Sequence, residues 1–154
     1  IKTMSNDNDN MNYKLAAAIV QPNSNYYLNL TTKERLKEIK AFGKDYIVQD
    51  SMDLWEISKE KKVIGNYVCY KAITKKVTIN SKGTFTRDIV AWFTTELPFY
   101  FGPKGDGGLP GLILELDDRV IKYTLHSINY VNNLKLSKPK DRKLVTKKEF
   151  RELY

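Results

Sequence analysis

The sequence has few of the residues on which many enzymes and metal sites depend. Its 154 residues include one histidine, His126, and one cysteine, Cys69. A single cysteine excludes an intramolecular disulfide, and zinc sites usually require several histidine or cysteine ligands. No stretch approaches the roughly 18 consecutive apolar residues of a membrane-spanning helix. We therefore expect no metal site and no cofactor, and we expect membrane contact only through an N-terminal anchor lost from this sequence.

Negative charge is also scarce. Eighteen acidic residues stand against 26 basic ones, which gives a formal net charge of +8. Residues 135–154 alone hold eight basic and three acidic residues. Such a tail is typical of a solvated chain end, and it also suits an anionic partner. Nucleic-acid binding is not expected, because it requires basic residues interleaved with exposed aromatic rings, whereas tyrosines in strands usually face a core.

What the sequence does have is a hydrophobic period of two, which is typical of β-strands. Residues 12–20 and 25–30 predict a first hairpin across a Pro-Asn-Ser-Asn turn. The charged residues 59–62 predict a turn, and Gly65 predicts a bulge in the long segment around it. The remaining segments with strand character are residues 45–50, 53–58, 63–80, 84–97, 112–116 and 119–131.

Residues 31–43, TTKERLKEIKAFG, break this period. Thr31 and Glu34 have the spacing of a helix capping box. Leu36 and Ile39 would share one helical face, and a glycine closes the segment. These features predict a short helix.

Neighbouring strands joined by short turns must pair antiparallel, because a parallel pair needs a crossover of a dozen or more residues. The predicted fold is therefore mostly β: a single curved antiparallel sheet, or an open half-barrel, with one or two short helices. We divide the chain into a frayed N-terminus at 1–11, one β domain at 12–131 and a basic C-terminal extension at 132–154. The extension is predicted to be a linker followed by a short helix, with Thr146 and Glu149 as its capping box.

Glycine and proline are concentrated in residues 98–111, directly before the apolar segment at 112–116. A Walker loop would need lysine and then serine or threonine after its second glycine, and a dinucleotide-binding loop would need glycine where Pro110 stands. Neither pattern is present. The segment instead predicts a rigid turn with three candidate roles: a structural corner, a corner that also lines a binding site, and a catalytic loop. The residues assigned to this structural motif are Gly102, Pro103, Gly108, Leu109, Pro110 and Gly111.

Acidic residues around this segment are the candidates for enzyme chemistry. Glu96 and Asp106 are the candidates for a hydrolase, but no nucleophile accompanies Asp106 in its loop. Strand alternation predicts that Glu115 faces solvent or pairs with a lysine. We therefore predict no catalytic residues.

The segment AWFTTELPFYFGPKGDGGLPGLILEL, residues 91–116, resembles the signature of the GLPGLI family of exported proteins from Bacteroidetes-type bacteria. Residues 55–72 are similar to the tryptophan strand of that family and to its Gly-x-Tyr-x-Cys-x-Lys-Ala segment. Arg87 and Asp88 depart from the family, which often has Gly-Arg there. The resemblance implies a place in the periplasm or at the cell surface, and an outer-membrane receptor or other envelope protein as partner. It implies no activity, because the family is uncharacterised.

From these features we expect a non-enzymatic, exported binding or accessory protein whose sheet holds an apolar groove for a hydrophobic ligand or peptide. The alternative is a structural or interaction subunit of an outer-membrane or envelope complex, with the partner on a sheet edge or on the basic tail. The candidates for lining the groove are aromatic and apolar residues near the loop: Trp55, Trp92, Phe93, Phe99, Tyr100 and Leu109.

Overall fold

The computed structural model describes residues 24–130, 132 and 135–153. The strand predicted at residues 12–20 lies outside the described residues. The elements within them are β1 (Tyr26–Asn29), β2 (Glu34–Ala41), β3 (Lys44–Asp50), β4 (Glu56–Ile64), β5 (Tyr67–Asn80), β6 (Gly83–Thr94), the 3-10 helix η1 (Pro103–Gly105), β7 (Leu112–Asp117), β8 (Lys122–Thr124), β9 (Lys143–Thr146) and the helix α2 (Lys147–Arg151).

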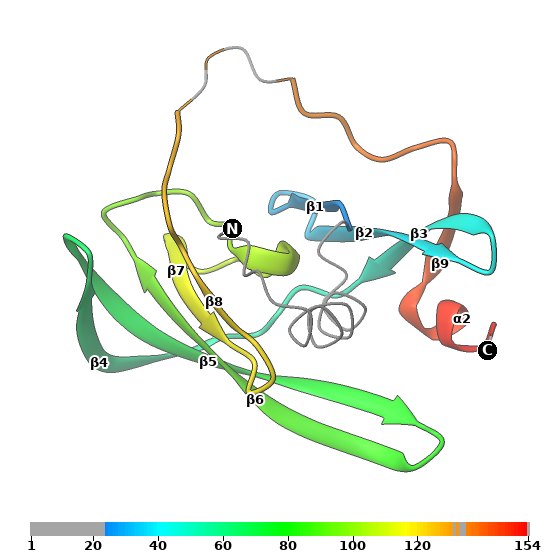
Figure 1. Ribbon diagram of the computed structural model, residues 1–154, viewed down its shortest axis with the longest axis horizontal. Helices are drawn as coiled ribbons and strands as arrows, with labels where there is room; N and C mark the ends of the chain where they lie inside the picture. The colour runs from blue at the N-terminus through cyan, green and yellow to red at the C-terminus, as the bar shows by residue number, and fades with distance from the viewer. Residues whose placement is uncertain (1–23, 131, 133–134, 154) are drawn as a thin grey trace, which may run out of the picture.

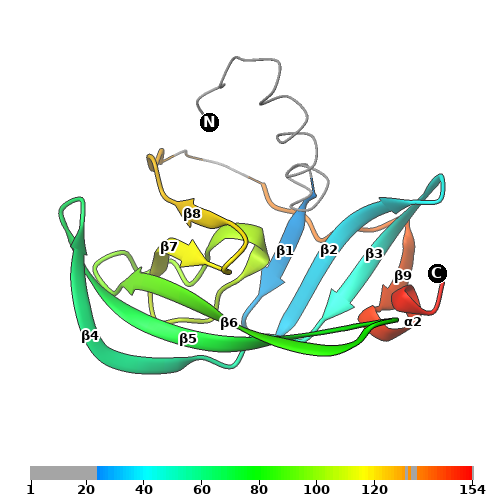
Figure 2. The same ribbon diagram turned by 60° about the horizontal axis from the view of Figure 1, so that its bottom comes forward.

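The strands form two sheets, with the orders β1-β2-β3-β9 and β4-β5-β6-β7-β8 (Figure 1). The mostly β class is confirmed, and the strands are divided between two sheets where the sequence predicted one. Strands joined by short turns pair antiparallel, as expected. β9 instead pairs parallel to β3, because a long crossover separates these two strands in the chain. The five-stranded sheet is strongly curved, and its β5–β6 hairpin extends past the neighbouring strands toward α2 (Figure 2).

The helix predicted at residues 31–43 is wrong, because most of this segment is strand β2. The spacing of Leu36 and Ile39 suits a helical face, yet in the strand these two side chains lie on opposite faces. Phe42 and Gly43 have φ values of 52° and 69° and form the two-residue turn into β3, the geometry of a type I′ hairpin. A strongly apolar neighbour, β3, therefore overrides the weak helical preference of β2.

Two further local predictions are corrected. Residues 59–62 are not a turn but part of β4, whose register against β5 shifts between Ile57 and Lys61. Gly65 is not in a bulge: it has a φ of 60° and lies in the turn between β4 and β5. The lysines at 59–62 thus line an edge strand, where charge discourages pairing with another chain.

The core of the five-stranded sheet lies on the side of the glycine-rich loop. One cluster combines Phe93, Ile113 and Leu116 with Leu109 of the loop. A second cluster contains Cys69, which is fully buried, as expected for a lone apolar thiol. Burial raises the pKa of this thiol.

The C-terminal residues are integrated into the four-stranded sheet. Residues 143–146, predicted as linker, form β9 and place Val145 beside Val48. The capping box of Thr146 and Glu149 is confirmed and begins α2, which packs the ring of Phe150 edge-on against Tyr46. The basic tail therefore contributes an edge strand and a helix to the four-stranded sheet.

Candidate functional site

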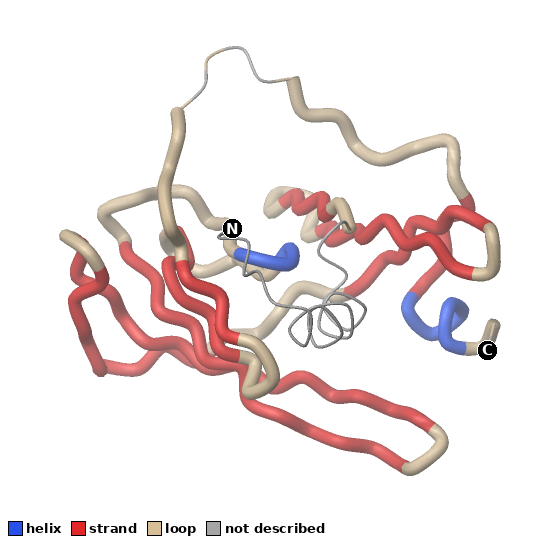
Figure 3. The backbone as a smooth tube through the Cα atoms, viewed as in Figure 1, coloured by secondary structure: helices blue, strands red, loops and turns tan. Residues whose placement is uncertain are grey.

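The glycine-rich loop folds back on itself between β6 and β7 (Figure 3). Gly108 N donates to Tyr100 O at 3.0 Å, and Ile113 N donates to Phe101 O at 3.0 Å. The loop is therefore held by its own backbone hydrogen bonds, and η1 lies at its tip.

Four glycines of this loop, Gly102, Gly105, Gly107 and Gly111, leave no room for a side chain, and two of them show what the loop packs against. A Cβ on Gly111 would lie 1.9 Å from Thr94 O, which belongs to the backbone of β6. Gly105 has a φ of +70°, and its Cβ would lie 2.7 Å from the ring of Tyr26 in β1. The loop is consequently pressed against both sheets.

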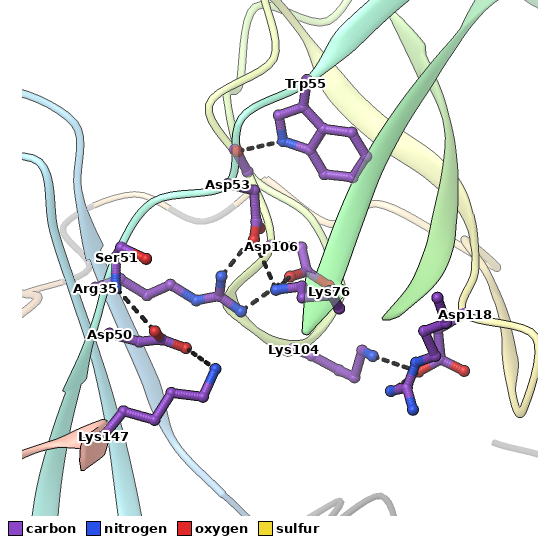
Figure 4. Close-up of polar contacts among 12 residues, drawn as sticks. Arg35, Asp50, Ser51, Asp53, Trp55, Lys76, Lys104, Asp106, Asp118 and Lys147 are labelled. Atoms are coloured by element: carbon purple, nitrogen blue, oxygen red, sulfur yellow. Dashed lines mark hydrogen bonds and ion pairs between the residues drawn. The ribbon is translucent and has the colours of Figure 1, made fainter. Parts of the chain in front are cut away.

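This close approach brings Asp106 into a cluster of four charged side chains, which we call the ion cluster: Arg35, Asp53, Lys76 and Asp106 (Figure 4). Arg35 Nη1 lies 2.9 Å from Asp53 Oδ2, and its Nη2 lies 2.9 Å from Asp106 Oδ1. Lys76 Nζ lies 2.7 Å from Asp53 Oδ1 and 3.2 Å from Asp106 Oδ1. Two positive and two negative charges therefore balance, and they join β2, β5, the β3–β4 connection and the loop.

The two carboxyl groups of the ion cluster differ in their environment. Burial alone would raise the pKa of Asp53, but Arg35 and Lys76 outweigh this effect and hold that pKa below its ordinary value. Asp106 is only 1% exposed, and burial raises the pKa of its carboxyl despite the same two cations. Its Oδ2 has no hydrogen-bond partner among the described residues.

A cleft of about 460 Å³ lies between the two sheets, next to the ion cluster. β2, β3 and α2 form one wall, and the β5–β6 hairpin with the turn after β7 forms the other. Its apolar lining consists of Ile39, Val48, Val77, Ile79, Ile89, Val120, Ile121 and Phe150. Its charged lining consists of Arg35, Lys37, Lys76, Arg87, Lys104, Lys147 and Arg151, with Asp50, Asp106 and Asp118. The cleft is thus apolar with an excess of positive charge.

Two cations of this lining, Lys37 and Arg151, form no ion pair with an acidic side chain among the described residues; Arg151 is exposed, and Lys37 is half-buried. Lys104 and Lys147 lie 2.7 and 2.8 Å from the carboxylates of Asp118 and Asp50. Lys37 has no acidic partner within the described part of the chain, and its Nζ lies 5.5 Å from the ring centre of Tyr26. Burial lowers the pKa of Lys37, and nearby cations lower it further.

The aromatic groove candidates lie in separate places. Trp55 Nε1 donates to Gly107 O at 3.0 Å, and Trp92 lies beneath Lys62, whose Nζ is 4.4 Å from the ring centre. Phe93 and Leu109 are buried core residues, whereas Phe99 and Tyr100 are partly exposed on the surface. None of these six candidates lines the cleft between the sheets.

The residues of the structural motif form the corner itself. Gly102 packs against Ile113, and Pro103 opens η1. Gly108 has a φ of +87°, and Gly111 N donates to Leu109 O at 2.8 Å beside Pro110. The motif therefore positions Asp106 in the ion cluster, and its last residue leads directly into β7.

The other acidic residues have structural partners. Glu115 lies 2.6 Å from Lys62 Nζ and 3.1 Å from Lys122 Nζ, so the predicted lysine pairing is confirmed. Glu96 accepts a hydrogen bond from Val68 N at 3.1 Å. Among the described residues, no group of three or more histidine, cysteine or acidic side chains is placed to hold a metal ion.

The sequence did not reveal the charged residues of the cleft. Arg35 and Lys37 belong to the segment that was predicted to be helical, and Asp53 and Lys76 carried no motif. One signal was present: in a strand, Arg35, Lys37 and Ile39 alternate onto one face, whereas a helix would scatter them.

Residues 80–115 match the model of a Bacteroidetes-type family described as a protein of unknown function (Porph_ging). The match covers β6, the glycine-rich loop and most of β7, about a quarter of the chain. No curated protein and no solved structure matches this chain. Among the described residues, no helix is both long and apolar enough to span a membrane. The finer GLPGLI assignment remains a proposal.

Proposed function

We propose that this chain is a non-enzymatic binding protein that holds a hydrophobic ligand in the cleft between its two sheets. The observation that carries the proposal is the apolar lining of this cleft. Val77 and Ile79 of the β5–β6 hairpin line it and are still 51% and 53% exposed. A ligand lying against them would remove apolar surface from water, at roughly 25 cal/mol per Å².

The dimensions and rigidity of the cleft support this proposal. A volume of about 460 Å³ falls within the range of small-molecule sites, roughly 300–1,000 Å³. The ion cluster joins the two walls at one end and so fixes their spacing. A preformed site loses little conformational entropy when it binds.

Binding is favoured over catalysis because the acidic side chains are already engaged. Asp106, the hydrolase candidate of the loop, is occupied by Arg35 and Lys76. A general acid or base must be within hydrogen-bond reach of a substrate. Here Oδ1 of Asp106 contacts two cations, and its Oδ2 is buried away from solvent.

We also propose export to the periplasm or cell surface. The support is the GLPGLI resemblance together with the family match over residues 80–115. Fractionation of the host with an antibody against the folded chain tests this part. Recovery with the cytoplasmic fraction contradicts it.

Two valine-to-tryptophan substitutions test the site. Val77 lines the cleft, and Val63 is a comparably exposed valine on β4 away from it. Binding of dodecanol, a neutral single-chain probe, is followed by nuclear magnetic resonance shifts of backbone amides. We expect shifts in β2, β5 and β6, loss of binding with Val77→Trp, and retained binding with Val63→Trp. Absence of binding, or equal effects of the two substitutions, overturns the proposal.

An interaction subunit of an envelope complex is the second candidate. It is favoured by the partial exposure of Phe99, Tyr100 and Phe101 in succession, since such a row of apolar rings is common in protein interfaces. A photo-cross-linking residue at position 100 in the host would give one defined adduct, which the same residue at Lys59 would not give. Equal products at both positions contradict this candidate.

A further inference from the structure

The charges of the cleft are unevenly matched. Asp50 pairs with Lys147, Asp118 pairs with Lys104, and the third acidic side chain of the lining belongs to the ion cluster. No carboxylate of the described lining is left for Lys37. The cleft therefore presents a cation whose counter-charge the described chain does not supply.

The surroundings of Lys37 make this imbalance costly. Burial is the first cause of the lowered pKa of Lys37, and Lys104, Arg35 and Lys147 lie close enough to disfavour its positive charge further. The Tyr26 ring beneath its ammonium group gives only partial compensation. A negative group bound here would remove the repulsion and restore the charged form.

A second group beside these lysines also has no partner. The Tyr123 hydroxyl is buried and makes no hydrogen bond within the described part of the chain, and the residue lines the cleft. Lys104 Nζ lies 5.2 Å from the centre of its ring. A phenol hydroxyl can donate a hydrogen bond, and a buried hydroxyl that donates none is unfavourable. An acidic oxygen in the cleft would satisfy it.

Apolar side chains continue from this polar end. Ile39 lies two residues beyond Lys37 on the same face of β2, and Phe150 of α2 and Val77 of β5 line the same cleft. A ligand that fits has an acidic group at one end and an apolar body at the other.

We propose that the cleft binds single-chain amphiphiles with an acidic head group, and that Lys37 binds this head group with help from Lys104 and the Tyr123 hydroxyl. The inference rests on the proposed function and specifies its ligand. A carboxylate and a phosphate monoester share the required chemistry, since both offer negatively charged oxygens to lysine.

The test compares dodecanoate, dodecyl phosphate and dodecanol below their micelle-forming concentrations, by isothermal titration calorimetry. We expect at least one of the two acids to bind about tenfold more tightly than the alcohol, as one charge-assisted hydrogen bond would give. The better acid identifies the source of the head group. Lys37→Met should reduce this preference to about twofold or less, while dodecanol affinity stays within about twofold.

Lys40→Met is the matched control, because Lys40 lies on the same strand with the opposite facing and does not line the cleft. It should keep the full acid preference. Tyr123→Phe, which removes only the hydroxyl, should reduce the preference severalfold. If dodecanol binds in the cleft but neither acid binds more tightly, or if Lys37→Met and Lys40→Met behave alike, this inference fails and the proposed function stands. If dodecanol and both acids fail to bind, the proposed function fails first.

Discussion

The ion cluster and Lys37 belong to the same cleft but use positive charge in opposite ways. In the ion cluster, Arg35 and Lys76 each contact both carboxylates, so that the charges cancel. Two positions further along β2, Lys37 faces the same cleft and has no acidic partner among the described residues. The first arrangement joins four segments of the chain, whereas the second leaves a half-buried positive charge unbalanced within those residues. Lys76 and Lys37 thus differ in their pairing and not in their residue type.

Removing a carboxylate from the ion cluster should have the largest effect. Asp106→Ala would leave the buried Arg35 and the half-buried Lys76 with one acid between them, and we expect a loss of about 3–5 kcal/mol in the free energy of unfolding. Urea denaturation measures it. Asp88→Ala is the control, because that carboxylate pairs on the surface with Lys75, and it should cost less than about 1 kcal/mol. Similar losses in the two variants would mean that the cluster is no more structural than a surface pair.

Displacing the loop tests the cluster indirectly. Gly111→Ala would place a Cβ against Thr94 O, so β6 and the loop must separate; we expect about 3 kcal/mol or more of destabilisation. Gly43→Ala makes the same change at a φ of +69° with nothing within 4 Å, and should cost about 1–2 kcal/mol. Thermal unfolding compares the two. Gly111 does not have a positive φ, so a cost no larger than that of Gly43→Ala would contradict the close approach as the reason for glycine at 111.

Acid should weaken the folded state through the carboxylates whose pKa is lowered. Asp53, Glu115 and Asp118 have lowered pKa values, because cations outweigh burial at the first and hydrogen bonds do so at the others. Their contribution is present above about pH 4 and is lost as the pH falls through their lowered values. Urea unfolding between pH 2 and 6 should show this loss, with a shallower dependence in Asp53→Asn.

Asp106 should contribute a pH dependence of stability of the opposite sign. Its raised pKa means that its contribution is lost as the pH rises through that value. The side-chain carbon resonances of the two aspartates should therefore titrate in the order Asp53 and then Asp106 as the pH rises. The reverse order would contradict the division of roles within the ion cluster.

Replacing Lys37 should have the smallest effect on stability. Since no acid of the described residues pairs with Lys37, Lys37→Met should leave the free energy of unfolding within about 0.5 kcal/mol, or raise it. Its lowered pKa means that wild-type stability should rise as the pH increases through that value toward about 10.5, the unfolded value. The variant should lack this rise. A clear destabilisation at pH 7 would assign Lys37 to the structural set.

The local features of this fold could be predicted from the sequence, whereas most of the long-range contacts could not. The strand segments at residues 84–97 and 112–116 and the capping box at Thr146 follow from nearby residues, and they are present as β6, β7 and the start of α2. The strand β2 was missed because its many charged residues obscure the alternation, which pairing with β1 and β3 stabilises. The ion cluster was out of reach, since Arg35 and Asp106 are 71 residues apart and no motif links them.

The groove candidates illustrate the same limit. Aromatic residues near the loop were chosen for apolar character, but composition does not say which side of a strand is covered. Phe93 and Leu109 are core residues, whereas the cleft is lined by lysines and isoleucines from different strands.

The parallel pairing of β3 with β9 determines when during folding the cleft can form. Tyr46 pairs with Lys143 across a chain segment of ~100 residues, and closing so long a loop is slow compared with forming the β4–β5 and β5–β6 hairpins. During synthesis the five-stranded sheet can assemble while the C-terminal segment is still being added. Lys147 and Phe150 of the cleft wall arrive only with that segment. In the proposed function, ligand binding would therefore require that this segment has already paired with β3.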